Sequence, residues 1–351
     1  MSGPIAPVRP ACGGRWIGPV ALLAMALALG GALRAAQLST RPLGFDEAFS
    51  WRVSRYPLPD LLRLVAGDNH PPLHFLLLKG WMSLLGEAEF ALRSLSLVFG
   101  ELSILFGHLL AMELAAWRRQ DFSTSSMAPA AARGKSWMPT FVAWGMAVSP
   151  ADIWWSGCAR MYALGVCLAL LSTLALVHAL RAPAFSWRNW SLYALAALAF
   201  LYTHYFALFT IAAQLGFVAA YSVWKATCPK EMLLAVAGRI VWPLAVIAVG
   251  SSPWLPAFLQ QQRQVRDAFW INPVATREAV NMAYQLLVEP RNGAYCEPGV
   301  ALAAGGEWTG DITTMAGEDG YAMGVVLPTA AVTSASWSES RRFRCVTPLV
   351  S

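Results

Sequence analysis

The segment from Asn189 to Trp224, NWSLYALAALAFLYTHYFALFTIAAQLGFVAAYSVW, contains no Lys, Arg, Asp or Glu. A helix needs about 20 apolar residues to cross the hydrocarbon core of a bilayer, so this segment is too long for one span. The polar pair Thr203-His204 lies in its middle and offers a turn between two spans. Each half is then short, which a tilted or packed bundle tolerates. The segment therefore predicts two consecutive spans of a polytopic membrane protein.

The composition of the whole chain agrees with this prediction. Of its 351 residues, 57% are hydrophobic and only 13% are charged, whereas soluble domains carry about 25% charged residues. The net charge of +6 is modest, and in a membrane protein it reflects cytoplasmic Lys and Arg. No basic stretch is interleaved with aromatic residues, so we expect no nucleic-acid partner. The expected class is an all-α, multi-pass protein of the cell membrane (plasma or inner membrane).

Apolar runs elsewhere in the chain predict the remaining spans. Together with the two above, the expected spans lie near residues 17–36, 91–116, 138–157, 162–180, 190–203, 205–224 and 239–258. The uncharged run at the start of the first span is longer than the roughly 7–15 residues of a signal peptide core. We therefore expect an uncleaved span preceded by a cytoplasmic tail, residues 1–16.

The segment 71–86 is apolar but short, and Lys79 interrupts it, so a full span, a re-entrant helix and an interfacial helix all fit it. The distribution of charge favours a helix that does not cross. The basic loops that should be cytoplasmic by the positive-inside rule are 117–135, 181–188 and 225–230. They all fall on one side only if residues 71–86 do not cross. The Arg residues of the first external loop do not follow this rule.

That external loop, residues 37–70, contains the acidic pair Asp46-Glu47. Two carboxylates at a membrane surface suit a general base and a metal ligand. The simpler interpretation is a solvated loop pair. Loops on a rigid scaffold commonly carry function, however, so both residues are candidate catalytic groups.

Three further polar clusters border apolar segments. In the first, two prolines follow Asp68 and His70, and fix the backbone where the chain enters the membrane. In the second, Arg160 and Tyr162 follow a pair of tryptophans, and an Arg there suits a phosphate or a headgroup anchor. In the third, His204 breaks the apolar segment quoted above, and either marks a functional site or forms the tip of a hairpin. For Glu101 and His108, which fall within a span, we expect packing or hydrogen bonds between helices.

The six cysteines contain no CxxC pair and no Cys/His spacing typical of a metal site. Cys167 lies in an apolar run and is expected to be a small core residue. A disulfide between Cys296 and Cys345 is possible, but the sequence does not support it. Residues 291–351 contain no run long enough to span and are rich in Gly, Ala, Ser and Thr. This atypical tail is predicted to be either of low order or a truncated or frame-shifted end.

Taken in order, these clusters resemble one family, the prokaryotic GT-C membrane glycosyltransferases related to protein mannosyltransferases and to the aminoarabinose transferases of lipid A. The resemblance covers residues 17–290, and each motif is weak alone while their order is specific. The motifs are FDEAFSW (45–51), DNHPPLHFLLLKGW (68–81), LGEAEFALRSLSLVFG (85–100), SPADIWWSGCARMYAL (149–164), YTHYFALF (202–209) and SSPWLPAFLQQ (251–261).

The resemblance implies a GT-C-type helical bundle with its site on the outer face. A polyprenyl-phosphate-linked sugar would be the donor, and a hydroxyl on a protein, lipid or glycan would be the acceptor, with inversion. Some relatives use a divalent metal, and the sequence does not establish one here.

The resemblance also assigns roles to residues of this chain. Asp46 matches the base or acceptor-binding carboxylate, and Glu47 is its neighbour in the motif. Residues matching substrate-binding positions are Asp68, His70, Arg160, Tyr162 and His204.

Two departures from the family pattern keep other functions open. Cys158 stands where relatives often carry an acidic residue, and the apolar pattern fails after about residue 290. A catalytically inactive relative is therefore one alternative. A transporter or flippase of a lipid-linked substrate is another, although a transporter would place its ionisable groups near the bilayer midplane.

Overall fold

The computed structural model describes residues 17–39, 41–123, 136–182, 185–225, 229–267, 313–316 and 322–325. The expected N-terminal tail, the Cys296–Cys345 pair and most of the atypical tail lie outside these residues. Within the tail, β1 (Thr313–Ala316) pairs antiparallel with β2 (Ala322–Val325). All other regular elements of the described chain are helical.

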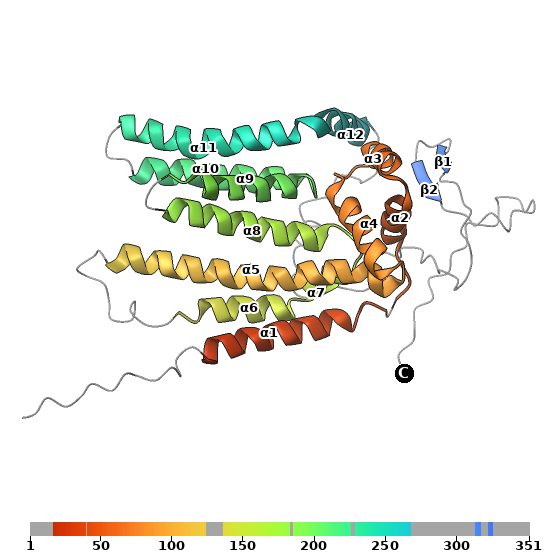
Figure 1. Ribbon diagram of the computed structural model, residues 1–351, viewed down its shortest axis with the longest axis horizontal. Coiled ribbons are helices and arrows are strands. Elements are labelled where there is room, and N and C mark those ends of the chain that lie inside the picture. Colours follow the sequence, from red (N-terminus) through yellow and green to blue (C-terminus); the bar gives the residue numbers. More distant parts are fainter. Residues whose placement is uncertain are drawn as a thin grey trace, which may run out of the picture.

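The main body is a bundle of helices that run side by side (Figure 1). These helices are α1 (Ile17–Ala35), α5 (Glu89–Ser123), α6 (Met138–Val148), α8 (Tyr162–Arg181), α9 (Trp187–Leu201), α10 (Ala207–Lys225) and α11 (Pro229–Ser251). By length and composition, five helices of the described part can cross a membrane: Gly18–Ala35 of α1, Glu89–Arg119 of α5, α8, α10 and the segment Ala237–Arg266. The predicted multi-pass, all-α class is confirmed.

A layer of shorter helices lies at one end of this bundle (Figure 1). It contains α2 (Phe45–Arg55), α3 (Leu58–Gly67), α4 (Leu73–Leu85) and α12 (Leu255–Asp267). The helix α7 (Pro150–Ser156) packs against α5 and α8, and a 3₁₀ turn, Ser252–Trp254, joins α11 to α12. The basic ends of α5, α8 and α10 lie at the opposite end of the bundle (Figure 1).

The expected external loop 37–70 is largely helical. Gly44 is the N-cap of α2, and its N–H donates to the Glu47 carboxylate at 3.0 Å, so the first turn is capped by its own acidic residue. Pro57 ends the connection to α3, and Pro59 occupies the first turn of that helix, where its missing N–H costs nothing.

The charge distribution predicted that residues 71–86 do not cross, and the helix α4 in this segment does not carry the chain across the bundle. Arg93, near the start of α5, donates to Leu38 O at 2.9 Å, just after the end of α1, so the segment between them begins and ends on one side. Thirteen helical residues span about 20 Å, which is short of the roughly 30 Å hydrocarbon core. Lys79 donates to Ser54 O and Tyr56 O at 3.2 and 2.8 Å, where it stabilises the C-terminal end of α2.

The expected span 138–157 is broken in two. Ser149 caps α7 by accepting a hydrogen bond from Asp152 N–H, and Pro150 starts that helix because a proline cannot continue α6. The turn predicted at Thr203-His204 is confirmed, since α9 ends at Leu201 and α10 begins at Ala207.

A buried arginine joins α1 to three other helices. The guanidinium of Arg34, 0% exposed, donates to Ala147 O, Met146 O and Ser156 Oγ at 3.1–3.2 Å. It also lies 3.7 Å from the Glu101 carboxylate on α5. The expected inter-helix role of Glu101 is therefore confirmed.

Two other sequence expectations for buried residues hold. His108 donates from Nδ1 to Pro139 O at 2.9 Å and joins α5 to α6. Cys167 is a buried free thiol in the α8 core. The largest apolar cluster lies between α8, α9 and α10 around Trp190 and Tyr193, so the core of the bundle supports the α9–α10 turn.

Candidate functional site

The predicted site residues lie in the connections at the end of the bundle that carries α2, α3 and α4. Asp46 is in the first turn of α2, and Arg160 is in the turn between α7 and α8. Arg160 Nη2 lies 3.4 Å from Asp46 Oδ2, although more than a hundred residues separate the two in sequence. The Asp46 side chain is 47% exposed, whereas that of Arg160 is 6% exposed. An open carboxylate thus stands against a buried cation.

Arg160 is held in place by α2. Its Nη1 donates to Asp46 O and to Ser50 Oγ, both at 3.3 Å. Its Nε is buried and has no hydrogen-bond partner in the described chain. A buried guanidinium N–H without a partner is costly, and a phosphate or carboxylate oxygen would match the planar donor edge. The side chain can therefore accept an anionic ligand.

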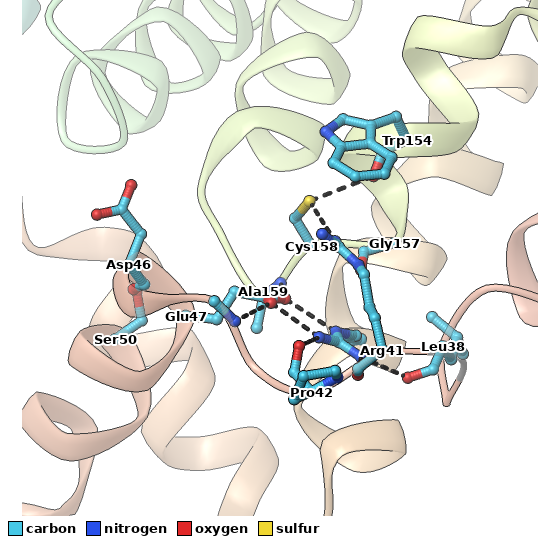
Figure 2. A network of polar contacts seen from close by, with 12 residues as sticks. Leu38, Arg41, Pro42, Asp46, Glu47, Ser50, Trp154, Gly157, Cys158 and Ala159 are labelled. Atoms are coloured by element: carbon cyan, nitrogen blue, oxygen red, sulfur yellow. Dashed lines mark hydrogen bonds and ion pairs between the residues drawn. The ribbon is translucent and has the colours of Figure 1, made fainter. Parts of the chain in front are cut away.

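Glu47 points the opposite way from Asp46 and is buried (Figure 2). One carboxylate oxygen accepts from Arg93 Nε and Ala159 N–H at 2.9 and 2.8 Å, and the other accepts from Arg93 Nη2 and Gly44 N–H at 2.8 and 3.0 Å. Burial alone would raise the pKa of Glu47, but these donors and the charge of Arg93 hold that pKa below its ordinary value. Glu47 is therefore ionised, and both of its carboxylate oxygens already accept two hydrogen bonds from the protein.

Arg93 was not singled out from the sequence, although it lies in the quoted motif LGEAEFALRSLSLVFG. All five of its N–H groups are used: besides Glu47 it donates to the backbone oxygens of Leu38, Arg41 and Pro42 at 2.9–3.0 Å. It therefore fixes the chain that leads from α1 into α2. The available signal was a single cation in an otherwise apolar run, which predicts a buried partner.

A second acidic and basic pair lies between α3 and α4. Asp68 Oδ2 accepts a hydrogen bond from His70 Nδ1 at 2.9 Å. Burial would raise the pKa of Asp68, yet the His70 hydrogen bond, with a smaller contribution from Arg160, keeps that pKa below its usual value. His74 is buried behind this pair, and its Nε2 donates to Ala159 O at 3.4 Å. The double-proline segment thus packs directly against the turn that carries Arg160.

His204 and Tyr162 complete the group. The ring of His204 lies 6.1 Å from that of His70 and 6.1 Å from that of Tyr162, centroid to centroid, and Tyr162 packs on Trp155 at 4.2 Å. Burial, the nearby His70 and the charge of Arg160 lower the pKa of His204 to about 4. The structure therefore brings together all the predicted residues except Glu47, whose carboxylate faces the Arg93 side.

Residues of the last motif, in α12 and in the 3₁₀ turn before it, support this group. Gln261, 0% exposed, donates to Val65 O at 2.8 Å and His70 O at 3.4 Å, and it accepts a hydrogen bond from Tyr205. Trp254 Nε1 in turn donates to the Tyr205 hydroxyl at 3.1 Å. The end of α3, the His70 segment and the α9–α10 turn are therefore tied to one buried amide.

Replacing this amide is expected to loosen the site. Gln261→Leu should lower the free energy of unfolding by about 1–3 kcal/mol, because it leaves buried carbonyl groups without a donor. Thermal unfolding of the detergent-solubilised protein measures the effect. Gln260→Leu, on the exposed side of the same helix, is the matched control, and an equal loss in both variants would contradict this role.

Cys158, the departure from the family pattern, is enclosed by Arg41. The Arg41 Nη2 group donates to Cys158 Sγ at 2.9 Å and to Gly157 O at 3.2 Å, and its guanidinium lies over the Trp154 ring (Figure 2). Burial raises the pKa of Cys158 to about 11, so the thiol is neutral at physiological pH. This position therefore carries no negative charge, and Arg41 is also held by Gly157 O and the Trp154 ring.

A divalent metal finds no ready set of ligands in the described chain. No group of three or more His, Cys, Asp or Glu residues there is placed to hold an ion. Asp46 and Asp68 each contact a cationic or imidazole partner instead.

Comparison with solved structures gives a structural likeness. No family model and no curated protein matches the sequence. The solved structure of the S. cerevisiae protein O-mannosyltransferase Pmt1-Pmt2 complex bound to the sugar donor is similar to this chain, with 18% sequence identity and a TM-score of 0.48. The match covers 70% of this chain and 35% of that chain, so this chain spans about a third of the length of the yeast chain.

Proposed function

We propose that this protein is a membrane glycosyltransferase of the GT-C type. It transfers a sugar from a polyprenyl-phosphate-linked donor to a hydroxyl of a protein, lipid or glycan at the outer face of the cell membrane. The contact between the open Asp46 carboxylate and the buried Arg160 guanidinium carries this proposal. The ordered motifs that resemble this enzyme group support it.

The chemistry requires a base for the acceptor hydroxyl and an anion-binding group for the leaving phosphate. Asp46 accepts the proton of the acceptor hydroxyl as the new bond forms at the anomeric carbon. The bond between that carbon and the phosphate oxygen breaks, and the electron pair leaves with the phosphate. Arg160 stabilises the growing charge on the phosphate because a buried cation interacts strongly with it. Attack from the face opposite the leaving group inverts the anomeric centre.

The other residues of the group bind and position the substrates. His70, with Asp68 behind it, and His204 border Arg160 from two other connections, and Tyr162 offers an aromatic surface for a sugar ring. Glu47 holds the first turn of α2 against Ala159, the residue before Arg160. It therefore sets the distance between base and cation without entering the reaction.

The position of these groups favours an enzyme over a transporter. They occupy connections at one end of the bundle, next to the ends of α1, α8 and α9 (Figure 1). A transporter for a lipid-linked substrate would bind it near the middle of the spans. Substrate bound at this end would meet a hydroxyl acceptor at the membrane surface and draw its lipid tail from the surrounding lipids.

Arg160→Gln is expected to reduce sugar transfer by about 10²–10³-fold, because it removes the charge that stabilises the leaving phosphate. Membranes containing the full chain are supplied with a radiolabelled polyprenyl-phosphate sugar, and product formation is measured. Arg160→Lys keeps the charge but loses the planar pair of donors, so an intermediate rate is expected.

Arg63→Gln is the control, because Arg63 is exposed on α3 and pairs with Asp60 at the surface. Equal rates for wild type and Arg160→Gln would contradict the assigned role of Arg160. No transfer by the wild type with any polyprenyl-phosphate sugar would instead support an inactive relative or a transporter.

A further inference from the structure

His204 lies in the short connection between α9 and α10, and a backbone contact fixes its hydrogen-bonding state. The N–H of Phe206 donates to His204 Nδ1 at 3.1 Å. An amide N–H cannot accept a hydrogen bond, so Nδ1 must offer its lone pair. A neutral imidazole carries one proton, and that proton therefore resides on Nε2.

The surroundings of His204 oppose a second proton. Protonation of Nδ1 would bring two N–H groups against each other and break the bond to Phe206. Burial, His70 from the α3–α4 connection and Arg160 from the α7–α8 turn lower the pKa of His204 to about 4. Tyr162 packs near its ring. His204 is thus neutral across the physiological range.

His70 is held in the opposite state. Its Nδ1 lies 2.9 Å from the Asp68 carboxylate, which accepts hydrogen bonds and donates none when ionised. His70 therefore carries a proton on Nδ1 and donates it to the Asp68 carboxylate. The two rings lie 6.1 Å apart, and Nδ1 donates a hydrogen bond in His70 but accepts one in His204.

We propose that His204 is a neutral hydrogen-bond donor, with its proton fixed on Nε2, for a phosphate oxygen of the lipid-linked donor. This inference rests on the proposed function and assigns the two parts of phosphate recognition to different residues. Arg160 supplies the positive charge, and His204 supplies a directed N–H that adds no charge. A hydrogen bond to a charged oxygen strengthens as the leaving phosphate gains charge, so the donor contributes to rate as well as to binding.

The tautomer is tested without any activity measurement. The full chain, labelled with ¹⁵N-histidine and reconstituted in lipid nanodiscs, contains five histidines, and the His204 signals are assigned as those lost in His204→Gln. We expect a neutral ring with an unprotonated Nδ1 at every pH between 5 and 8. A His204 ring that gains a proton near pH 6.5, or that carries its proton on Nδ1, would overturn the proposal.

The role toward phosphate is tested by a pair of amides. Gln places an N–H near the position of Nε2, whereas Asn places an oxygen near Nδ1 and restores only the contact with Phe206. With labelled polyprenyl-phosphate sugar, His204→Gln should keep kcat/KM within a few fold of wild type. His204→Asn should lose about 10–100-fold, the effect of removing one hydrogen bond to a charged group.

His204→Lys tests whether a positive charge can replace the neutral hydrogen-bond donor. This variant should lose as much activity as His204→Asn. The reverse order, with Lys active and Gln inactive, would show that charge is required and would overturn the proposal. If the wild type transfers no sugar, the proposed function fails, and the nuclear magnetic resonance result still decides whether the tautomer is as inferred.

Discussion

Asp46→Asn is expected to lower kcat for sugar transfer by about 10²–10⁴-fold, the usual contribution of a general base. The substitution keeps the size of the side chain and removes its ability to take a proton. Because Asp46 is half exposed and lies in the first turn of α2, the fold should be retained. KM for the donor should change much less than kcat, since Arg160 and its contacts with the α2 backbone remain.

The measurement is steady-state transfer of a labelled sugar from polyprenyl phosphate in membranes with matched protein content. Asp60→Asn is the control, because Asp60 is another partly exposed acid in a helix first turn of the same layer, and it pairs with Arg63 at the surface. Transfer that Asp46→Asn leaves undiminished would rule out Asp46 as the base. The Asp68–His70 pair would then be the next candidate.

Arg93→Met is expected to destabilise the protein by about 3–5 kcal/mol, because it leaves the buried Glu47 carboxylate without its countercharge. The same substitution removes the donors that hold the chain between α1 and α2. Unfolding of the detergent-solubilised protein, followed by the loss of helical circular dichroism, measures the change. Since the pKa of Glu47 is lowered by folding, the contribution of the pair is present at neutral pH and is lost as the pH falls through that pKa.

Two further variants separate the buried charge from the lost contacts. Adding Glu47→Gln to Arg93→Met removes the uncompensated charge, so part of the lost stability should return. Arg63→Met breaks an exposed pair and should cost less than about 1 kcal/mol. A loss in Arg93→Met no larger than in Arg63→Met would mean that the buried pair does not stabilise the fold.

Asp46 and Glu47 show what the sequence could predict about the site and what it could not. They are neighbours of similar chemistry, and both were assigned to catalysis from sequence. Successive helical residues point about 100° apart, so one carboxylate faces the open end of the bundle while the other faces α5. Sequence alone does not say which, because the direction depends on how α2 is rotated against Arg93 and Ala159.

The layer of short helices was the least predictable part of the fold. Hydropathy detects segments long enough to span, and α2, α3 and α4 are too short or too polar for that signal. The charge distribution nevertheless predicted that residues 71–86 do not cross, since a crossing would have placed the basic loop 117–135 outside. Lys79 lies within the apolar helix α4 and binds the C-terminal end of α2.

The sequence by itself determined that the chain is a multi-pass helical membrane protein, where most spans lie, and which end carries the polar motifs. These features follow from local properties, because apolar length and flanking charge act within each segment. Only the tertiary structure decided that Asp46 faces Arg160, that Glu47 is a buried anchor, and that Phe206 fixes the proton of His204. The first two are contacts between residues distant in the chain, and they form only after the helices have packed. The third depends on the backbone direction in the turn between α9 and α10.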